Sequence, residues 1–324
     1  MDLWSLADLA TPWCLHVVVT LRVPERLEPG PAAIADLAAA CGADADALAR
    51  VLRQLIAKGL FAEPAPGTFA LNDAARELPG LRIGFDLETL GGRMAHSWST
   101  LLQAVRTGRP AYADVFGRGF WEDLEANPAL AADFDVMMGP AGHGTPDPEV
   151  LLDPAAWSAI RTVADIGGGT GSLLAEVLKS HPHLHGTLVD LPRTVARSGE
   201  MFAAAGVADR ASVAPQSFFD SLPAGCDLYL LRKVLDDWPD REAVAILSRC
   251  AEAARPHGRV VAVTGVTPEP VADPNLLMLV LVGGKTRTLD EFRALARQAG
   301  LEVTAAGRNP KGRFLVECRA IIAR

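Results

Sequence analysis

One stretch, VADIGGGTGSLLAEVL at residues 163–178, constrains the fold more than any other part of the chain. It is typical of a buried strand, a glycine-rich turn and a helix, and Gly167, Gly169 and Gly171 permit positive φ angles and close approach of a ligand. Strand and helix patterns alternate from residue 157 onward, which predicts an α/β fold with a doubly wound, mainly parallel sheet. We expect strands near 162–166, 186–190, 211–215, 227–231, 258–266, 301–306 and 313–321.

The end of the chain departs from this parallel pattern. The segment RNPKGR joins the last two expected strands. It is too short to contain a crossover helix, so these two strands are predicted to form an antiparallel hairpin.

Two acids beside the glycines indicate which ligand the loop binds. A GxGxG turn alone could bind NAD, or could be a plain turn capped by acids. Asp165 comes directly before the glycines, where its carboxylate would repel a pyrophosphate but can face the cationic methionyl ammonium of S-adenosylmethionine. Asp190 ends the next strand, about 20 residues past the glycines, where an acid can hold ribose hydroxyls. Together the two acids favour S-adenosylmethionine.

The N-terminal region, residues 1–83, has the helix, helix, hairpin order of a winged helix. AAIADLAAACG and DADALARVLRQLIAKGLF have helical spacing, and GLFAEPAPGTFALN predicts two short strands around a turn. Residues 1–80 hold ten Asp and Glu against six Lys and Arg, the wrong balance for a phosphate-binding surface. We therefore expect this region to serve packing or dimerisation, with DNA binding as the disfavoured alternative.

Residues 84–150 predict a mostly helical region rich in aromatic side chains, before the cofactor-binding region at 151–324. Its end, GPAGHGTPDPE at 139–149, is a Gly/Pro-rich linker. The aromatic residues and the two methionines that follow them either pack as core or form the wall of a pocket for a flat ligand. They are Trp98, Tyr112, Phe116, Phe120, Trp121, Phe134, Met137 and Met138.

Composition limits the setting in which the chain works. The net charge of −8 disfavours nucleic acid or an anionic membrane as the main partner. No apolar run approaches the ~18 residues of a membrane span, and the N-terminus lacks the basic start of a signal peptide. Five scattered cysteines without a CxxC pair favour free thiols in a cytoplasmic protein and disfavour a metal site.

Further motifs follow in a characteristic order along nearly the whole chain. They are LADLATPWCLHVVVTLRVPERL, AVRTGRPAYADVFGRGFWEDLEANPALAADFDVMM, VADIGGGTGSLL, GTLVDLP, SFFDSLP, VLDDWPDREAVAILSRC and LLMLVLVGGKTRT. In this order the chain resembles the small-molecule O-methyltransferases that use S-adenosylmethionine, particularly the bacterial branch acting on aromatic polyketides. The resemblance implies a class I methyltransferase domain, a homodimer joined through the N-terminal domain, and a substrate pocket covered by the helices of 84–150.

The resemblance also assigns roles to single residues. Asp165 and the glycines match the cofactor loop, and Asp190 matches the acid that holds the ribose. Ser217 stands where relatives often carry an acid for the adenine amine, which weakens or replaces that contact. Arg232 stands where relatives often have a lysine near the cofactor carboxylate, and a plain surface arginine is the alternative. We further expect cofactor contacts from Leu191, Phe218 and Trp238, and substrate contacts from Trp98, Phe120, Met137, Met138, Asn275 and Met278.

The catalytic base of the family is replaced in this chain. Relatives contain VLHDW, whose histidine is the general base, and here that position is Asp236. Thr264 and Thr286 stand where relatives have the acids that flank the histidine, and no histidine occurs between 186 and 256. The whole group of residues around the base has therefore changed together.

Three roles remain open for Asp236: a true base, a hydrogen-bonding partner of the substrate, or a structural acid at the strand end. An ordinary aspartate has a pKa near ~3.9 and a phenol near ~10, a mismatch that burial could reduce. General base catalysis contributes ~10²–10⁴-fold, whereas orienting the nucleophile can contribute ~7–11 kcal/mol. A methyltransferase can therefore work mainly by proximity on an acidic phenol.

Three functions are compatible with these residues. The first is O-methylation of a phenolic hydroxyl of an aromatic polyketide-type metabolite. The second keeps S-adenosylmethionine but performs hydroxylation, decarboxylation or cyclisation, as some relatives without the histidine do, with the sulfonium as a fixed positive charge. The third, a winged-helix regulator that senses a ligand, is disfavoured by the acidic N-terminal region.

Overall fold

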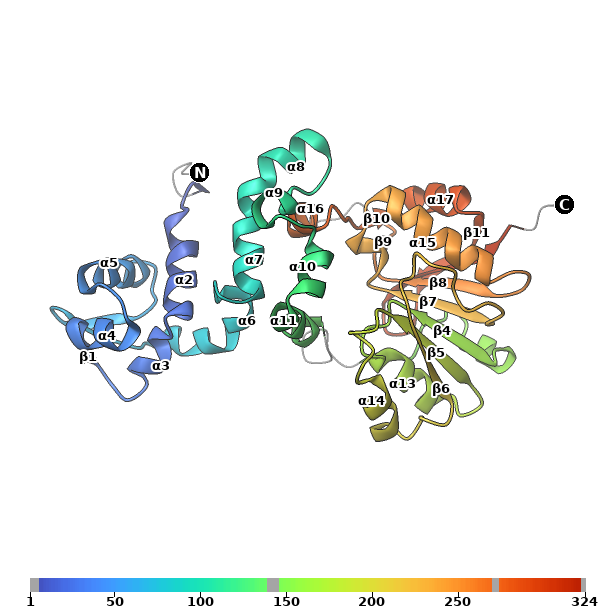
Figure 1. Ribbon diagram of the computed structural model, residues 1–324, viewed down its shortest axis with the longest axis horizontal. Coiled ribbons are helices and arrows are strands. Elements are labelled where there is room, and N and C mark those ends of the chain that lie inside the picture. The colour runs from blue at the N-terminus through green and yellow to red at the C-terminus, as the bar shows by residue number, and fades with distance from the viewer. Residues whose placement is uncertain (1–5, 139–145, 270–273, 322–324) are drawn as a thin grey trace. The chain divides into compact units, whose positions relative to one another are not determined.

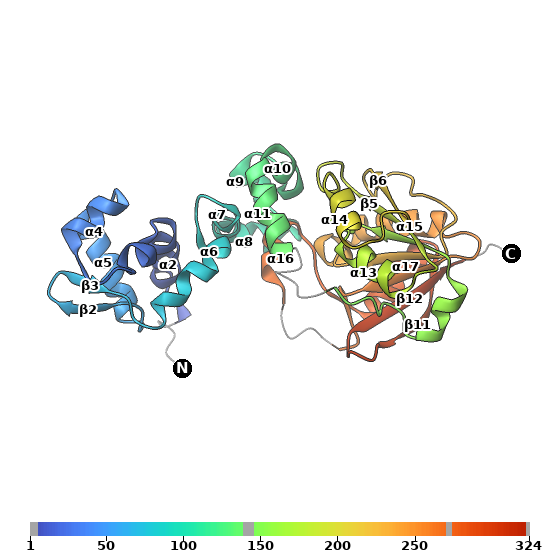
Figure 2. The same ribbon diagram turned by 90° about the horizontal axis from the view of Figure 1, so that it is seen from below.

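The computed structural model of the chain describes residues 6–138, 146–269 and 274–321. Backbone contacts divide the chain into two compact units, Met1–Trp98 and Ser99–Arg324. The first is mostly helical and the second is built around a large sheet (Figures 1 and 2). The three-region division with boundaries at 83 and 150 stays a prediction, and residues 139–145 of the expected linker lie outside the described residues.

The first unit contains the predicted helix, helix, hairpin order. Helix α5 (Ala45–Ile56) begins after Asp44, whose carboxylate accepts a hydrogen bond from the Ala47 N–H at 2.9 Å. Its apolar residues recur at helical spacing and are buried on one face. The other elements are α2 (Ala10–Thr20), α3 (Val23–Leu27), β1 (Ala32–Ala33), α4 (Ile34–Cys41), β2 (Ala62–Ala65), β3 (Thr68–Ala70), η1 (Ala75–Leu81), α6 (Arg82–Phe85) and α7 (Leu90–Ser97). The strands pair antiparallel in the order β1-β3-β2.

The second unit contains a seven-stranded sheet in the order β11-β12-β8-β7-β4-β5-β6. The strands are β4 (Thr162–Ile166), β5 (His185–Asp190), β6 (Ala211–Pro215), β7 (Leu228–Arg232), β8 (Arg259–Val263), β11 (Leu301–Arg308) and β12 (Phe314–Ala320). Strands β8, β7, β4, β5 and β6 run parallel, whereas β12 is antiparallel to both β11 and β8. This confirms the doubly wound fold with an antiparallel hairpin at its end.

Helices cover both faces of this sheet because alternate strand residues point to opposite sides. In β7, Tyr229 and Leu231 pack into one core with helices α15 (Asp240–Ala253) and α17 (Leu289–Gln298). Leu228 and Leu230 pack into the other core with α13 (Ser172–Ser180) and α14 (Ser198–Ala204). Figure 1 shows these helices around the strands. The remaining elements are η2 (Trp98–Thr100), α8 (Leu101–Thr107), α9 (Tyr112–Phe116), α10 (Phe120–Ala126), α11 (Pro128–Met138), η3 (Pro154–Ala159), η4 (Leu235–Asp237), β9 (Val266–Thr267), α16 (Leu276–Leu281) and β10 (Arg287–Thr288).

One expected strand, 258–266, is divided into two. Strand β8 ends at Val263 because Thr264 and Gly265 adopt left-handed backbone conformations, with φ angles of 81° and 76°. The chain then turns into β9, which pairs with β10 instead of the large sheet. This turn follows the carboxyl end of β8, which lies beside β7, so it belongs to the same edge of the sheet as the glycine-rich loop.

That edge is where a doubly wound sheet binds its ligand. From β4 the chain order proceeds outward through β5 and β6 on one side, and β7 lies on the other side. The carboxyl ends of β4 and β7 therefore flank the point at which the strand order reverses, which is the usual ligand position in such sheets. Within the described ranges, none of the helices has the length and apolarity needed to span a membrane.

Candidate active site

The glycine-rich loop connects β4 to α13 and makes close contacts that exclude side chains. Gly169 has a φ of 62°, a conformation that favours glycine. A Cβ on Gly168 would lie 2.5 Å from Oδ2 of Asp165, closer than atoms can approach. The loop backbone therefore passes directly over the Asp165 carboxylate, as the sequence predicted for a ligand-binding turn.

Asp165 is a buried acid at the carboxyl end of β4. Its side chain is 1% exposed, and neither carboxylate oxygen accepts a hydrogen bond from another described residue. Burial raises the pKa of Asp165 to about 7; Arg232 acts to lower it and the nearby Asp190 to raise it further. A buried carboxylate without a hydrogen-bonding partner is suited to a cationic ligand.

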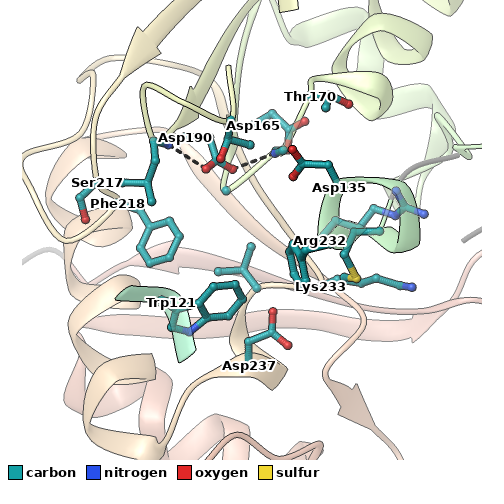
Figure 3. A pocket seen from close by; sticks show the side chains of 18 of the residues that line it. Trp121, Asp135, Asp165, Thr170, Asp190, Ser217, Phe218, Arg232, Lys233 and Asp237 are labelled. Carbon is teal, nitrogen blue, oxygen red and sulfur yellow. Dashed lines mark hydrogen bonds between the residues drawn. The ribbon is translucent and has the colours of Figure 1, made fainter. Parts of the chain in front are cut away.

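Asp190 ends β5 and holds the loop in place. Its Oδ2 accepts a hydrogen bond from the Gly169 N–H at 2.8 Å, and its Oδ1 accepts one from the Leu191 N–H at 2.7 Å (Figure 3). Burial raises the pKa of Asp190, while these two backbone donors act to lower it. A carboxylate fixed by two backbone donors keeps lone pairs for a ligand hydroxyl.

A cavity of about 250 Å³ opens beside these two acids. Figure 3 shows Asp165 and Asp190 along one side of it, with Trp121 and Asp237 across from them and the Phe218 ring between. Predicted residues that line the cavity are Asp165, Gly167, Gly169, Asp190, Leu191, Ser217, Phe218, Arg232, Trp238 and Met138. The structure thus brings most of the expected cofactor residues to one place.

Ser217 and Arg232 both line this cavity. The Ser217 hydroxyl accepts a hydrogen bond from the Phe219 N–H at 3.2 Å. Arg232 is half-buried, and its positive charge acts to lower the pKa of Asp165. Burial lowers the pKa of Arg232, so this guanidinium is partly desolvated and is more than a surface residue.

Several other predicted residues do not line the cavity. Gly171 caps the start of α13. Phe120 is buried and packs edge-to-face against Tyr112 and Trp121, which is the core interpretation of the aromatic segment. Trp98 is 44% exposed at the start of η2, Met137 is half-buried in α11, Met278 lies in α16, and Asn275 precedes α16 with a left-handed φ of 50°.

Asp236 and Asp237, the two acids of the replaced motif, differ in position. Asp237 lines the cavity, whereas Asp236 does not. The Asp236 side chain lies against Gly265, where an added Cβ would be 3.2 Å from its Oδ1. Burial raises the pKa of both acids, and for Asp237 the charge of Asp236 adds to the effect. Asp236, which the sequence analysis expected at the histidine position, therefore faces the turn after β8.

The turn that carries these acids is held by a buried arginine. Arg287 is 1% exposed and donates hydrogen bonds to the carbonyl oxygens of Leu235 at 2.6 Å and Trp238 at 2.7 Å. Its Nε donates to Asp240 at 2.9 Å. Arg287 therefore fixes the start and the end of the segment that contains both acids, a role that spacing in the sequence did not reveal.

Trp121, which the sequence assigned either to core or to a pocket wall, lines the cavity and stacks on Trp238 with ring centroids 5.8 Å apart. Two cations of the cavity were absent from the sequence prediction. The first, Arg193, lies 3.5 Å from both Glu125 and Asp135. The second, Lys233, lines the cavity directly after β7. The available signal was sequence adjacency, since Lys233 directly follows Arg232 at the end of β7 and Asp237 lies between Asp236 and Trp238. Among the residues that the structure describes, no group of three or more His, Cys, Asp or Glu side chains could hold a metal ion.

Comparison with known families gives matches over most of the chain. Residues 98–302 match a family described as the O-methyltransferase domain, and residues 4–78 match the O-methyltransferase dimerisation domain. The cavity lies wholly within the first of these matched ranges.

The alignments with individual relatives extend over most of both chains. A 2,7-dihydroxy-5-methyl-1-naphthoate 7-O-methyltransferase of Streptomyces carzinostaticus is 42% identical over 94% of each chain. The aclacinomycin 10-hydroxylase RdmB of Streptomyces purpurascens is 37% identical over 93% of this chain and 84% of its own. The O-methyltransferase NcsB1 from neocarzinostatin biosynthesis, solved with S-adenosylmethionine and 2-hydroxy-5-methyl naphthoic acid, has a TM-score of 0.87 at 40% identity over 99% of each chain.

Proposed function

The chain belongs to the O-methyltransferase family, and from that premise we propose that it transfers a methyl group from S-adenosylmethionine to a phenolic hydroxyl of an aromatic polyketide-type metabolite. The observation that carries this proposal is the cavity at the carboxyl ends of β4, β5 and β7, with Asp165 and Asp190 on one side and an aromatic wall on the other. This cavity lies in the matched O-methyltransferase domain.

The residues around the cavity fit S-adenosylmethionine. Asp165 is buried without a hydrogen-bonding partner on either oxygen, which suits the methionyl ammonium. Asp190 is fixed by two backbone donors and can accept from ribose hydroxyls. Arg232 can pair with the methionyl carboxylate. Phe218 and Trp238 offer apolar surface to the adenine, with Ser217 in place of the family's acid.

A flat aromatic acceptor fits the other wall. Trp121, Phe134 and Met138 line it, and such side chains suit a planar ligand. The naphthoate named for the 42% identical relative is an acceptor of this kind. We therefore take 2,7-dihydroxy-5-methyl-1-naphthoate as the first acceptor to test.

The reaction proceeds mainly by positioning. When bound, the cofactor supplies an electrophilic methyl group on a sulfonium. Asp236, at the family's base position, faces Gly265 and does not line the cavity, so removal of the phenolic proton is not assigned to it. Holding the acceptor oxygen in line with the methyl group can contribute ~7–11 kcal/mol, which is sufficient for an acceptor that ionises readily.

The test is incubation of the enzyme with the naphthoate and methyl-labelled S-adenosylmethionine, followed by mass spectrometry. We expect one labelled methyl ether. An acceptor that gains oxygen or loses its carboxyl group, with the label retained on the cofactor, would contradict methyl transfer.

A second candidate is a tailoring reaction without methyl transfer. The observation that favours it is the 37% identity to a hydroxylase, together with Asp236 at the position of the family's histidine. In this case the bound sulfonium would act as a fixed charge. The same mass measurement separates the two functions.

We infer that the chain forms a homodimer through its N-terminal unit, works in the cytoplasm, and has no nucleic-acid partner. The match to the dimerisation domain supports the first inference, as do the exposed apolar side chains Leu9 at 77% and Trp13 at 39%. The acidic charge of the chain supports the last. Light scattering should give twice the chain mass, and a well-behaved monomer at micromolar concentration would contradict the dimer.

A further inference from the structure

Lys233 is the first residue after β7, and its side chain lines the cavity. Its backbone adopts a left-handed conformation with a φ of 55°, which is uncommon for a residue other than glycine. The Lys233 N–H donates to Thr264 Oγ1 at 3.0 Å and to the Val263 carbonyl at 3.3 Å. Thr264 is itself left-handed, with a φ of 81°. Lys233 and Thr264 thus place two left-handed residues other than glycine at neighbouring strand ends. Residues in such uncommon backbone conformations concentrate at functional sites.

The other cations of the cavity lie on its cofactor side. Arg232 acts on the charge of Asp165, and Arg193 acts on that of Asp190, the two acids expected to hold the cofactor. Figure 3 shows Lys233 on the far side of the cavity from Asp190 and Ser217, which are expected to bind the adenosine. Lys233 therefore lines a part of the cavity that is away from the expected adenosine site.

Charged groups around Lys233 come from three elements. Asp236 and Asp237 on η4 are the acids that act on it, and Arg232 on β7 and Arg313 next to β12 are the cations. Burial lowers the pKa of Lys233 and the two arginines add to this, while the two aspartates oppose it. A half-buried ammonium of this kind interacts more strongly with an anion than a solvated one does.

We propose, on the basis of the methyltransferase function above, that Lys233 is the catalytic residue that replaces the family's histidine, by binding the acceptor oxygen as a phenolate. Histidine removes the proton during the reaction, whereas Lys233 lowers the pKa of the bound phenol so that the proton leaves to solvent beforehand. Thr264 is a positioning residue that holds the Lys233 turn.

The reaction balances without a protein base. A lone pair of the phenolate oxygen forms the bond to the methyl carbon as the carbon–sulfur bond breaks, and sulfur keeps that electron pair. The negative charge of the phenolate and the positive charge of the sulfonium both disappear. Lys233 keeps its three protons throughout.

The test measures ionisation of the bound acceptor without turnover. The enzyme with S-adenosylhomocysteine is titrated with 2,7-dihydroxy-5-methyl-1-naphthoate, and the phenolate absorption is followed from pH 5 to 10. In wild type the pKa of the bound 7-hydroxyl should lie about one to three pH units below that of the free ligand, as expected for an opposite charge within ~4–6 Å. In Lys233→Met this lowering should be lost, and in Lys233→Arg most of it should remain. 2-Hydroxy-5-methyl-1-naphthoate, which lacks the 7-hydroxyl, serves as the ligand control.

Turnover gives a second readout. At pH 7, Lys233→Met should lose about 10–1,000-fold in kcat/KM, the size of a shift of one to three pH units in acceptor ionisation. The loss should shrink as the pH rises past the pKa of the free phenol. Lys179→Met, which removes a surface lysine 2.9 Å from Glu176 on α13, should match wild type in both readouts.

Three results would overturn the proposal. They are a bound phenol whose pKa is not lowered in wild type, a Lys233→Met variant with an unchanged bound pKa, and a loss of more than 10-fold in S-adenosylhomocysteine affinity in Lys233→Met, which would make Lys233 a cofactor ligand. If wild type neither binds nor methylates the naphthoate or related naphthols, the proposed function fails and this inference fails with it. Circular dichroism confirms that each variant is folded.

Discussion

The main-chain N–H of Lys233 donates a hydrogen bond to the Thr264 hydroxyl across 3.0 Å, and both residues are left-handed. This contact joins the ends of two neighbouring parallel strands, β7 and β8, at the edge of the cavity. Thr264 therefore has a structural role, because its hydroxyl holds the turn that begins at Lys233.

Thr264→Val should lower turnover by about 10-fold and leave cofactor affinity within about 2-fold of wild type. The substitution keeps the side-chain shape but leaves the Lys233 N–H with only the longer bond to Val263, and loss of one such bond is worth ~0.5–1.5 kcal/mol. Steady-state kinetics and calorimetry measure the two quantities. Thr264→Ser, which keeps the hydroxyl, should restore turnover, and failure of this rescue would count against the positioning role.

Asp190→Ala should weaken binding of S-adenosylmethionine and of S-adenosylhomocysteine by about 10–100-fold. The substitution removes the expected ribose contact and the acceptor for the Gly169 N–H, and hydrogen bonds to a charged group are worth ~1.5–3 kcal/mol each. Isothermal calorimetry measures the affinities. Asp220→Ala, at an exposed position near the same edge, is the control. Unchanged affinity in Asp190→Ala would remove Asp190 from the cofactor site.

Asp165 should make the cofactor-free protein less stable as the pH rises from about 4 to about 7. Burial raises the pKa of Asp165 to about 7 in the folded state, against 3.8 ordinarily, so the folded protein binds more protons than the unfolded chain in this range. Stability then falls with rising pH. Asp165→Asn removes the ionisation, so it should gain roughly 2–4 kcal/mol relative to wild type between pH 4 and pH 8.

Thermal unfolding of both proteins across this pH range measures the difference. Asp209→Asn, at an exposed aspartate, should follow the wild-type curve. Parallel curves for wild type and Asp165→Asn would show that Asp165 has an ordinary pKa in the folded state.

Asp236→Asn should lose no more than about 10-fold in kcat, because Asp236 faces Gly265 and does not line the cavity. A true base would give ~10²–10⁴-fold. Asp236→His should gain little, since Thr264 and Thr286 supply no carboxylate to orient the ring. The measurement is kcat against pH for all three proteins. A loss above ~10³-fold in Asp236→Asn, with a flattened pH profile, would establish Asp236 as the base.

Much of the fold could be predicted because its signals are local. The glycine-rich turn, the alternation of strands and helices, and the short RNPKGR connection each restrict the backbone within a few residues, and the sheet follows from them. The division of strand 258–266 could not be read from composition, since VVAVTGV is apolar almost throughout. It depends on two left-handed residues, Thr264 and Gly265, and threonine as a residue type rarely adopts that conformation.

The candidate site was predictable on the cofactor side and much less so on the acceptor side. Asp165 and Asp190 follow directly from strand ends, where the fold determines side-chain position. Asp236 and Asp237 are neighbours in one short turn, and only three-dimensional contacts with Gly265 and Arg287 decide which of them faces the cavity. Phe120 was expected at the substrate, but its ring is used in packing against Tyr112.

The most direct test of methyl transfer is a single-turnover reaction with S-adenosylmethionine carrying a ¹³C methyl group, excess enzyme and 2,7-dihydroxy-5-methyl-1-naphthoate. The amounts of labelled methyl ether and of S-adenosylhomocysteine are followed together by mass spectrometry. We predict that the two form at the same rate and in equal amounts. A converted naphthoate without the label, with S-adenosylmethionine left intact, would contradict a methyltransferase and establish the non-methylating reaction.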